Sequence, residues 1–179
     1  PAVAGSQARF PLRRIYCIGR NYAEHAREMG AEVERARPMF FMKPADAVVT
    51  DGADVPWPSA TSDLHHEIEM VVALREGGRD IPLARALDCV YGYGVGLDLT
   101  RRDLQAAAKA KAHPWDAAKG FDASAPVSAI HPVDAVGHPR DLSLSLEVNG
   151  AQRQRASTGD MIFDVAAIIH GLSRLWGLP

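Results

Sequence analysis

Short apolar segments separated by glycine and proline form the main hydrophobic pattern of this chain. Residues 14–18 and 40–42 are brief apolar runs that predict strands, and residues 65–74 form a longer run of the same kind. Residues 142–148 alternate strictly between apolar and polar side chains, and the turn Asn149-Gly150 follows them. This combination predicts a hairpin with a return strand after the turn.

The helical pattern is confined to a few short segments. We expect helices at residues 21–29, 101–112 and 163–176. Residues 86–97 predict either a strand or a passage from helix into strand. Asn21 and Thr100 are competent N-caps, and Asp103 follows Thr100 at the spacing of a capping box. Many short strands with a few short helices predict an α+β, mainly β fold rather than a doubly wound α/β sheet.

The composition is that of an ordinary globular domain and argues against several classes of partner. The chain has 179 residues, of which 47% are hydrophobic and 23% charged, with a formal net charge of −2. It has no basic stripe interleaved with aromatic residues, so nucleic acid is not an expected partner. No apolar run approaches the ~20 residues that span a bilayer and no signal peptide is evident, so we expect a cytoplasmic protein without a membrane partner. Cys17 and Cys89 lie in apolar runs and predict buried thiols in a reducing compartment.

The strand predicted at residues 65–74 carries two carboxylates on one face. Glu67 and Glu69 are two residues apart, so in an extended strand their side chains point the same way. Like charges at this separation raise each other's pKa unless a cation offsets them. Oxygen ligands at this spacing suit Mg²⁺ or Mn²⁺. A solvated edge strand with two surface glutamates explains the pair equally well.

A third acid follows a strand segment that alternates bulky residues with glycine. Gly92, Gly94, Gly96 and Asp98 fall on one face, and a glycine-lined face indicates close approach to the backbone. Tight packing alone would also explain the glycines, and Asp98 could be a polar group beside a helix. Three acids without a pair of cysteine ligands favour a Mg²⁺-type site over structural zinc.

Several motifs, in order along the chain, resemble those of the fumarylacetoacetate hydrolase family. They are Tyr16-Cys-Ile-Gly-Arg-Asn-Tyr-Ala-Glu-His-Ala-Arg-Glu28, Phe41-Met-Lys-Pro44, Asp63-Leu-His-His-Glu-Ile-Glu69, Gly96-Leu-Asp-Leu-Thr-Arg-Arg-Asp-Leu-Gln105 and Lys119-Gly-Phe-Asp-Ala-Ser-Ala-Pro126. Each motif alone is weak, but together they are specific. The chain is most similar to short bacterial members, which include fumarylpyruvate hydrolases and acylpyruvases of aromatic-acid breakdown.

The resemblance implies a fold, an assembly and a metal. It implies a mixed β-sandwich roll assembled as a homodimer, with Glu67, Glu69 and Asp98 binding Mg²⁺ or Mn²⁺ as the cofactor. It also implies that residues 1–13 are an N-terminal extension and that residues 14–179 are the catalytic domain. Family members continue with a Thr-Gly-Thr-Pro loop and closing strands beyond the stretch that ends here at Pro179, so we expect these parts to be absent from this chain.

Two residues of the first predicted helix are candidates for activating water. His25 and Glu28 lie three residues apart, so on a helix they share a face and can pair. A carboxylate beside an imidazole orients the ring and raises its basicity, as a general base requires. Without the resemblance, an incidental surface pair would be the simpler interpretation.

The resemblance also assigns residues to substrate. Lys119 matches the family's active-site lysine, and Arg102 and Gln105 match positions that contact substrate. These two lie three residues apart on the helix that follows Asp98, and arginine is well suited to a carboxylate. Lys43 is a weaker candidate for the same role.

These residues together predict hydrolysis of a 2,4-dioxo acid to pyruvate and a second acid such as fumarate. The rival within the family is an oxaloacetate-type decarboxylase or an isomerase of ring-cleavage products. Because His25 with Glu28 favours water activation, hydrolysis is the first choice. A rival of another class is a binding module that keeps the metal site without catalysis.

Overall fold

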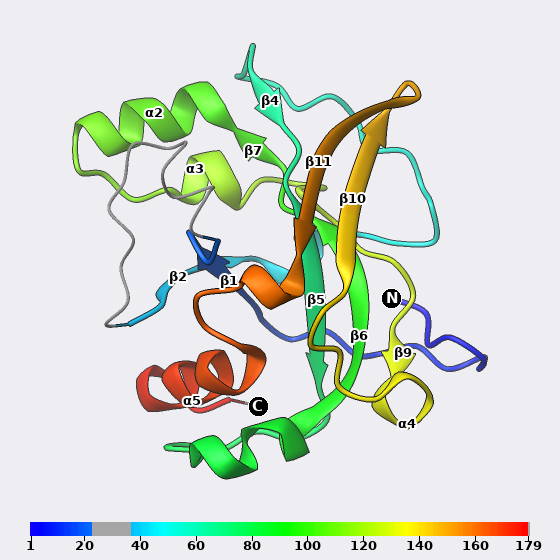
Figure 1. Cartoon of the computed structure of the whole chain (residues 1–179). Helices are drawn as coiled ribbons and strands as arrows, with labels where there is room; N and C mark the ends of the chain where they lie inside the picture. Colours follow the sequence, from blue (N-terminus) through cyan, green and yellow to red (C-terminus); the bar gives the residue numbers. More distant parts are fainter. Residues whose placement is uncertain (23–36, 179) are drawn as a thin grey trace. The chain divides into compact units, whose positions relative to one another are not determined.

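The computed structural model describes residues 1–22 and 37–178 (Figure 1). The chain divides into two compact units, each assembled from three separate segments of sequence. Unit 1 contains residues 1–17, 41–71 and 94–131, and unit 2 contains residues 18–40, 72–93 and 132–179. The helix expected at residues 21–29 lies largely outside the described residues, and so do His25 and Glu28.

Unit 1 contains short paired strands and two helices. Its elements are η1 (Ala45–Ala47), β3 (Val48–Val49), β4 (Leu64–His65), β7 (Thr100–Arg101), α2 (Arg102–Ala110), α3 (Asp116–Lys119) and β8 (Ala125–Pro126). Strand β3 pairs in parallel with β8, and β4 pairs with β7 in antiparallel fashion. Ala47, Thr100 and Ser124 are fully buried and mark the centre of this unit.

The first residues of the chain pack as part of unit 1. Val3 forms a parallel bridge with Ile130, the Ala4 amide donates to the Ile130 carbonyl at 2.9 Å, and the Ile130 amide donates to the Ala2 carbonyl at 2.8 Å. Val3 and Ile130 are both buried. The segment expected as an N-terminal extension therefore contributes to the core of this unit.

Four longer strands have residues in both units. They are β1 (Ile15–Gly19), β2 (Met39–Lys43), β5 (Ile68–Leu74) and β6 (Val90–Leu97). Strand β1 pairs with β2, and β6 lies between β5 and β9 (His131–Pro132). These elements confirm the α+β fold with more strand than helix.

Unit 2 ends with the last helix packed against a 3-10 segment. Its elements are η2 (Leu83–Cys89), α4 (Val133–Val136), β10 (Ser143–Val148), β11 (Ala151–Ser157), η3 (Thr158–Asp160) and α5 (Val165–Leu175). The side chain of Asp164 caps α5 by accepting a hydrogen bond from the Ala167 amide at 2.8 Å. Ser173 Oγ accepts from the Ile81 amide at 2.9 Å, and the apolar face of α5 is buried at Ile169 and Leu172.

Three local expectations changed in the structure. The strand expected at residues 65–74 is broken, because β4 ends at His65 and β5 begins at Ile68. Thr100 is not an N-cap: it lies in β7, and its hydroxyl donates to the Asp98 carbonyl at 3.2 Å. Asp103 forms no capping box, because its carboxylate accepts from the Thr61 hydroxyl at 2.7 Å.

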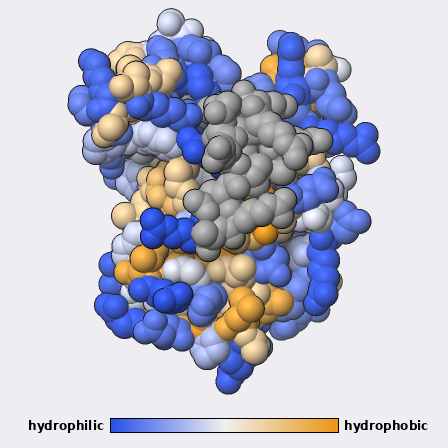
Figure 2. All heavy atoms as spheres, turned by 60° about the vertical axis from the view of Figure 1, so that its left-hand side comes forward, coloured by the Kyte–Doolittle hydropathy of each residue, from blue (hydrophilic) through white to orange (hydrophobic). Residues whose placement is uncertain are grey.

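The described helices include none long and apolar enough to cross a membrane. Hydrophilic and hydrophobic residues are interspersed over the face drawn in Figure 2. The large apolar side chains that are most exposed, Trp57 and Leu175, lie in different units.

Candidate functional site

The three predicted metal ligands lie in unit 1, where a backbone hydrogen bond brings two of them side by side. The Asp98 amide donates to the Glu67 carbonyl at 2.8 Å. Glu67 occupies the break between β4 and β5, and Asp98 directly follows β6. Both residues are buried, with 9% of Glu67 and 7% of Asp98 exposed. Glu69 lies in β5, near enough to both for their charges to act on it.

Lys119 bridges the first two acids. Its ammonium group lies 2.6 Å from Glu67 Oε2 and 2.6 Å from Asp98 Oδ2, and it donates a hydrogen bond to each. Lys119 is the last residue of α3 and is only 3% exposed. Its ammonium group also lies 5.1 Å from the centre of the Phe41 ring, at a distance that permits a cation–π contact.

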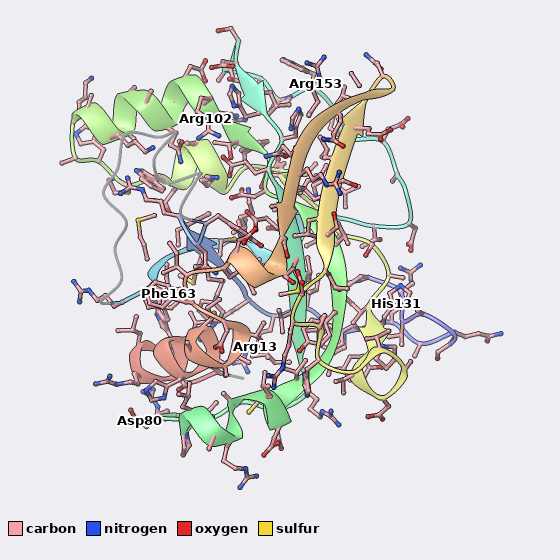
Figure 3. The ribbon with its side chains drawn as sticks, in the orientation of Figure 1. Arg13, Asp80, Arg102, His131, Arg153 and Phe163 are labelled. Atoms are coloured by element: carbon pink, nitrogen blue, oxygen red, sulfur yellow. The ribbon has the colours of Figure 1, made fainter. Side chains whose placement is uncertain are left out.

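Arg102 and Gln105 extend from the first turn of α2 and reach the same cluster (Figure 3 labels Arg102). Arg102 Nη2 donates to Glu67 Oε1, and Nη1 donates to Gln105 Oε1 at 2.5 Å. Gln105 is 3% exposed. The three-residue spacing that was expected to place Arg102 and Gln105 on one face of the helix therefore brings them into direct contact.

Lys43 also reaches the cluster, from the end of β2. Its ammonium group donates to the Leu99 carbonyl at 3.0 Å and to the Lys119 carbonyl, and it lies 2.9 Å from Asp98 Oδ1. Asp98 Oδ1 is buried, yet it accepts no hydrogen bond from any group in the described segments. The ion pair at this oxygen is therefore close without the alignment of a hydrogen bond.

The two glutamates differ in their affinity for a proton. Burial raises the pKa of Glu67, but Lys119 and Arg102 outweigh burial and hold that pKa at about 2. Burial, followed by the charges of Asp98 and Glu67, raises the pKa of Glu69 to about 8. Burial, with Asp98 nearby, also raises the pKa of the Cys17 thiol to about 12, so this thiol is a neutral neighbour of the cluster.

The donor set suits a hard divalent cation, although its present arrangement is that of an ion-pair cluster. Three carboxylates converge, and Asp98 Oδ1 is a buried acceptor without a hydrogen bond from the described residues. Within residues 1–22 and 37–178, no three acid, histidine or cysteine side chains are already arranged as metal ligands. Lys119 lies 2.6 Å from one carboxylate oxygen of Glu67 and 2.6 Å from one of Asp98.

Sequence reasoning missed two side chains that line this cluster. The Phe121 ring lies 4.3 Å from the Arg101 guanidinium and 5.6 Å from the Lys43 ammonium group. Phe121 stands two residues after Lys119 in the same motif, which was the available signal. Arg101 had a signal of the same kind, because it stands in the motif of residues 96–105.

Most of the chain matches the sequence profile of one known family. Residues 14–179 match the profile of the fumarylacetoacetate (FAA) hydrolase C-terminal family. The chain belongs to the fumarylacetoacetate hydrolase family. The match confirms the resemblance carried by the sequence motifs, and the fold agrees with it.

Relatives in this family have more than one activity. The fumarylpyruvate hydrolase of Pseudomonas aeruginosa, solved in complex with Mn²⁺ and pyruvate, is 49% identical with a TM-score of 0.94, over 99% of this chain and 78% of that one. The mitochondrial oxaloacetate tautomerase FAHD1 of Homo sapiens is 43% identical over 163 residues, which are 91% of this chain and 73% of that protein. The mitochondrial oxaloacetate decarboxylase of Dictyostelium discoideum is 40% identical over 167 residues, which are 93% and 76% of the two chains.

Proposed function

We propose that this family member is a divalent-metal hydrolase that cleaves a carbon–carbon bond in a 2,4-dioxo acid such as fumarylpyruvate or an acylpyruvate. The observation that carries the proposal is the buried cluster in which Lys119 and Arg102 bind the carboxylates of Glu67 and Asp98. Such a cluster concentrates charged groups that can bind a small anionic substrate in a water-poor site. The 49% identity to a fumarylpyruvate hydrolase supports the choice of substrate.

The residues that would hold Mg²⁺ or Mn²⁺ are Glu67, Glu69 and Asp98. When bound, such an ion supplies Lewis acidity, which polarises a 2-oxo group and stabilises negative charge that develops there. Lys119 now neutralises two of these carboxylates at 2.6 Å. With a metal in the site, Lys119 would be placed to donate to oxygens of the substrate.

Arg102 and Gln105 orient the substrate in this proposal. The Arg102 guanidinium already spans Glu67 and Gln105, which fixes its plane. A guanidinium has five N–H donors, so it can hold these partners and still bind a substrate carboxylate. Gln105 is buried and offers an amide N–H₂ group as a further donor.

His25, oriented by Glu28, is the proposed general base. It takes a proton from water, and the hydroxide adds to the distal carbonyl of the dioxo acid. The bond between that carbon and the adjacent methylene breaks, and its electron pair stays with the pyruvate portion. A proton then adds to the methylene carbon, so one water is consumed and pyruvate and a carboxylic acid leave.

The deciding experiment is turnover of fumarylpyruvate, followed by the loss of its enol absorbance and by the appearance of pyruvate. We expect the enol absorbance to fall with Mn²⁺ present and to stay unchanged after EDTA. In His25→Ala we expect a turnover rate at least about 100-fold lower, because a general base has been removed. His113→Ala is the matched control, because His113 is exposed on the loop after α2. Full turnover by His25→Ala would contradict the hydrolytic mechanism.

Conversion of oxaloacetate is the second candidate function. It is favoured by relatives of 43% and 40% identity that are an oxaloacetate tautomerase and an oxaloacetate decarboxylase. The same assay run on oxaloacetate as well as fumarylpyruvate separates the candidates by the substrate that is consumed. On oxaloacetate, decarboxylation releases pyruvate and CO₂, whereas enol-to-keto conversion releases no pyruvate. Activity on oxaloacetate with none on fumarylpyruvate or acylpyruvates would replace the first proposal with the second.

A further inference from the structure

The Lys43 ammonium group is buried and surrounded by oxygens of the protein itself. The side chain is 2% exposed, and the residue as a whole is 3% exposed. An ammonium group has three N–H donors. Three protein oxygens surround this one, namely the carbonyls of Leu99 and Lys119 and the Oδ1 atom of Asp98. Protein oxygens therefore enclose an ammonium group that is almost wholly buried, which argues against the substrate-binding role expected from the sequence.

The three oxygens belong to the two segments that present the reactive side chains. Asp98 and Leu99 lie between β6 and β7, and Lys119 ends α3. The Lys119 carbonyl accepts a second hydrogen bond, from Ser124 Oγ at 3.1 Å, and the Ser124 carbonyl accepts from the Leu99 amide at 3.1 Å. Lys43 therefore closes a ring of hydrogen bonds that ties the end of α3 to the segment carrying Asp98.

Lys43 also acts on Asp98 without consuming its acceptor capacity. Its ammonium group lies 2.9 Å from Oδ1, yet no described group donates an aligned hydrogen bond to that oxygen. Because this ion pair is not an aligned hydrogen bond, a lone pair of Oδ1 stays available. Lys119 differs, because both of its contacts within the cluster are hydrogen bonds to carboxylate oxygens.

We propose that Lys43 is a positioning residue that fixes the Asp98 carboxylate and the main chain at Lys119, and that it makes no contact with substrate. This inference deepens the proposed function and rests on it for the identity of the metal ligands. Removal of a residue that holds a metal ligand in place typically lowers metal affinity or activity about 10- to 100-fold. A substrate contact would instead change KM and leave the affinity for metal alone unaltered.

The test compares Lys43→Met with wild type in the absence of substrate and then with substrate. Mn²⁺ binding is measured by titration of the metal alone, and kcat and KM are measured at saturating Mn²⁺. We expect Mn²⁺ affinity to fall about tenfold and kcat to fall about tenfold, with KM changed less than about twofold. Lys111→Met is the matched control, because Lys111 is exposed at the end of α2. A KM raised about tenfold with unchanged Mn²⁺ affinity would overturn the proposal.

A measurement on the unaltered chain covers the case in which Lys43→Met does not fold. The chain has four lysines, so ¹⁵N-lysine labelling gives a simple spectrum of the ammonium groups. We expect the Lys43 signal to be protected from exchange and to stay in place when pyruvate is added to the Mg²⁺-loaded protein, while the Lys119 signal moves. Movement of the Lys43 signal with pyruvate would overturn the proposal. Because Mn²⁺ affinity is read without turnover, inactivity of wild type on every substrate would reject the proposed function and leave this test intact.

Discussion

At the scale of single residues, Glu67 and Glu69 show which pKa shifts their spacing in the sequence could predict and which it could not. Their separation predicted that each would raise the pKa of the other. The pKa of Glu69 is raised to about 8, mainly by burial, then by the charge of Asp98 and only after that by the charge of Glu67. The pKa of Glu67 is instead held at about 2, because Lys119 and Arg102 reach it. Both cations come from distant parts of the sequence, so strand periodicity could not predict them. The face shared by Arg102 and Gln105 is local, and it was predictable.

Replacement of Glu69 by glutamine tests this asymmetry. A raised pKa means that wild-type stability is full below the ordinary glutamate pKa and is lost as the pH rises toward 8. Glu69→Gln lacks this loss, so without metal we expect it to exceed wild type by about 1–3 kcal/mol at pH 8 and by little at pH 5. Thermal or urea unfolding in EDTA at the two pH values measures the difference. Glu76→Gln, on the exposed residue two positions after β5, is the control, and an equal gain there would contradict the explanation.

Arg102 offers a second test at this scale. Lysine keeps the charge but cannot span Glu67 and Gln105 with one planar group. We expect Arg102→Lys to lower kcat/KM for the dioxo acid about 10- to 100-fold, mainly through KM, because ground-state binding of a carboxylate is weakened. Steady-state kinetics at saturating Mn²⁺ measure the change. Unaltered KM would remove Arg102 from the substrate site.

At the scale of elements, the glycine-rich strand β6 was interpreted correctly in one respect. Alternating glycines predicted close approach to the backbone, and the described neighbours of Gly96 confirm it. The approaching groups belong to the chain itself, since a Cβ on Gly96 would lie 2.9 Å from Val71 Cγ2 and 3.1 Å from the Pro126 carbonyl oxygen. The capping pattern at Thr100 failed, because pairing of β7 with β4 took that residue into a strand. Local sequence signals thus predict a helix or a strand, but they do not show which distant segment pairs with a given residue.

A pair of glycine-to-alanine variants tests the packing interpretation. Gly96→Ala forces a methyl group against a side chain and a backbone oxygen, so we expect a loss of about 1–3 kcal/mol in the free energy of unfolding. Gly171→Ala lies inside α5, where its methyl group would meet Phe40 Cζ at an ordinary 3.4 Å. Helix propensity predicts a gain of about 0.5–1 kcal/mol there. Chemical denaturation measures both variants, and equal effects would refute the role assigned to Gly96.

At the scale of the whole molecule, the sequence supported the fold class but not its connections. Hydrophobic patterns placed strands near residues 15–19 and 143–157 because those patterns are local. Each compact unit gathers three separate segments, and Val48 pairs with Ala125 across a long stretch of chain. Such pairings depend on complementarity between segments and leave no periodic trace. The family motifs did predict the overall fold, because they contain residues from the distant segments that pair with one another.

Metal addition is the test that involves the folded chain as a whole. A ligand that binds only the folded state at 100 times its dissociation constant stabilises it by about 2.7 kcal/mol. For a chain of this size that corresponds to a rise in Tm of roughly 5–10 °C. We expect Mn²⁺ to give this rise in Tm and EDTA to reverse it. Asp98→Asn should abolish the rise, because Asp98 is buried and its Oδ1 atom accepts no hydrogen bond from the described residues. Asp134→Asn, on the exposed surface of α4, should retain the full rise. A rise that survives in Asp98→Asn would mean that the cation binds elsewhere, because a ligand lost from the cluster must weaken binding there.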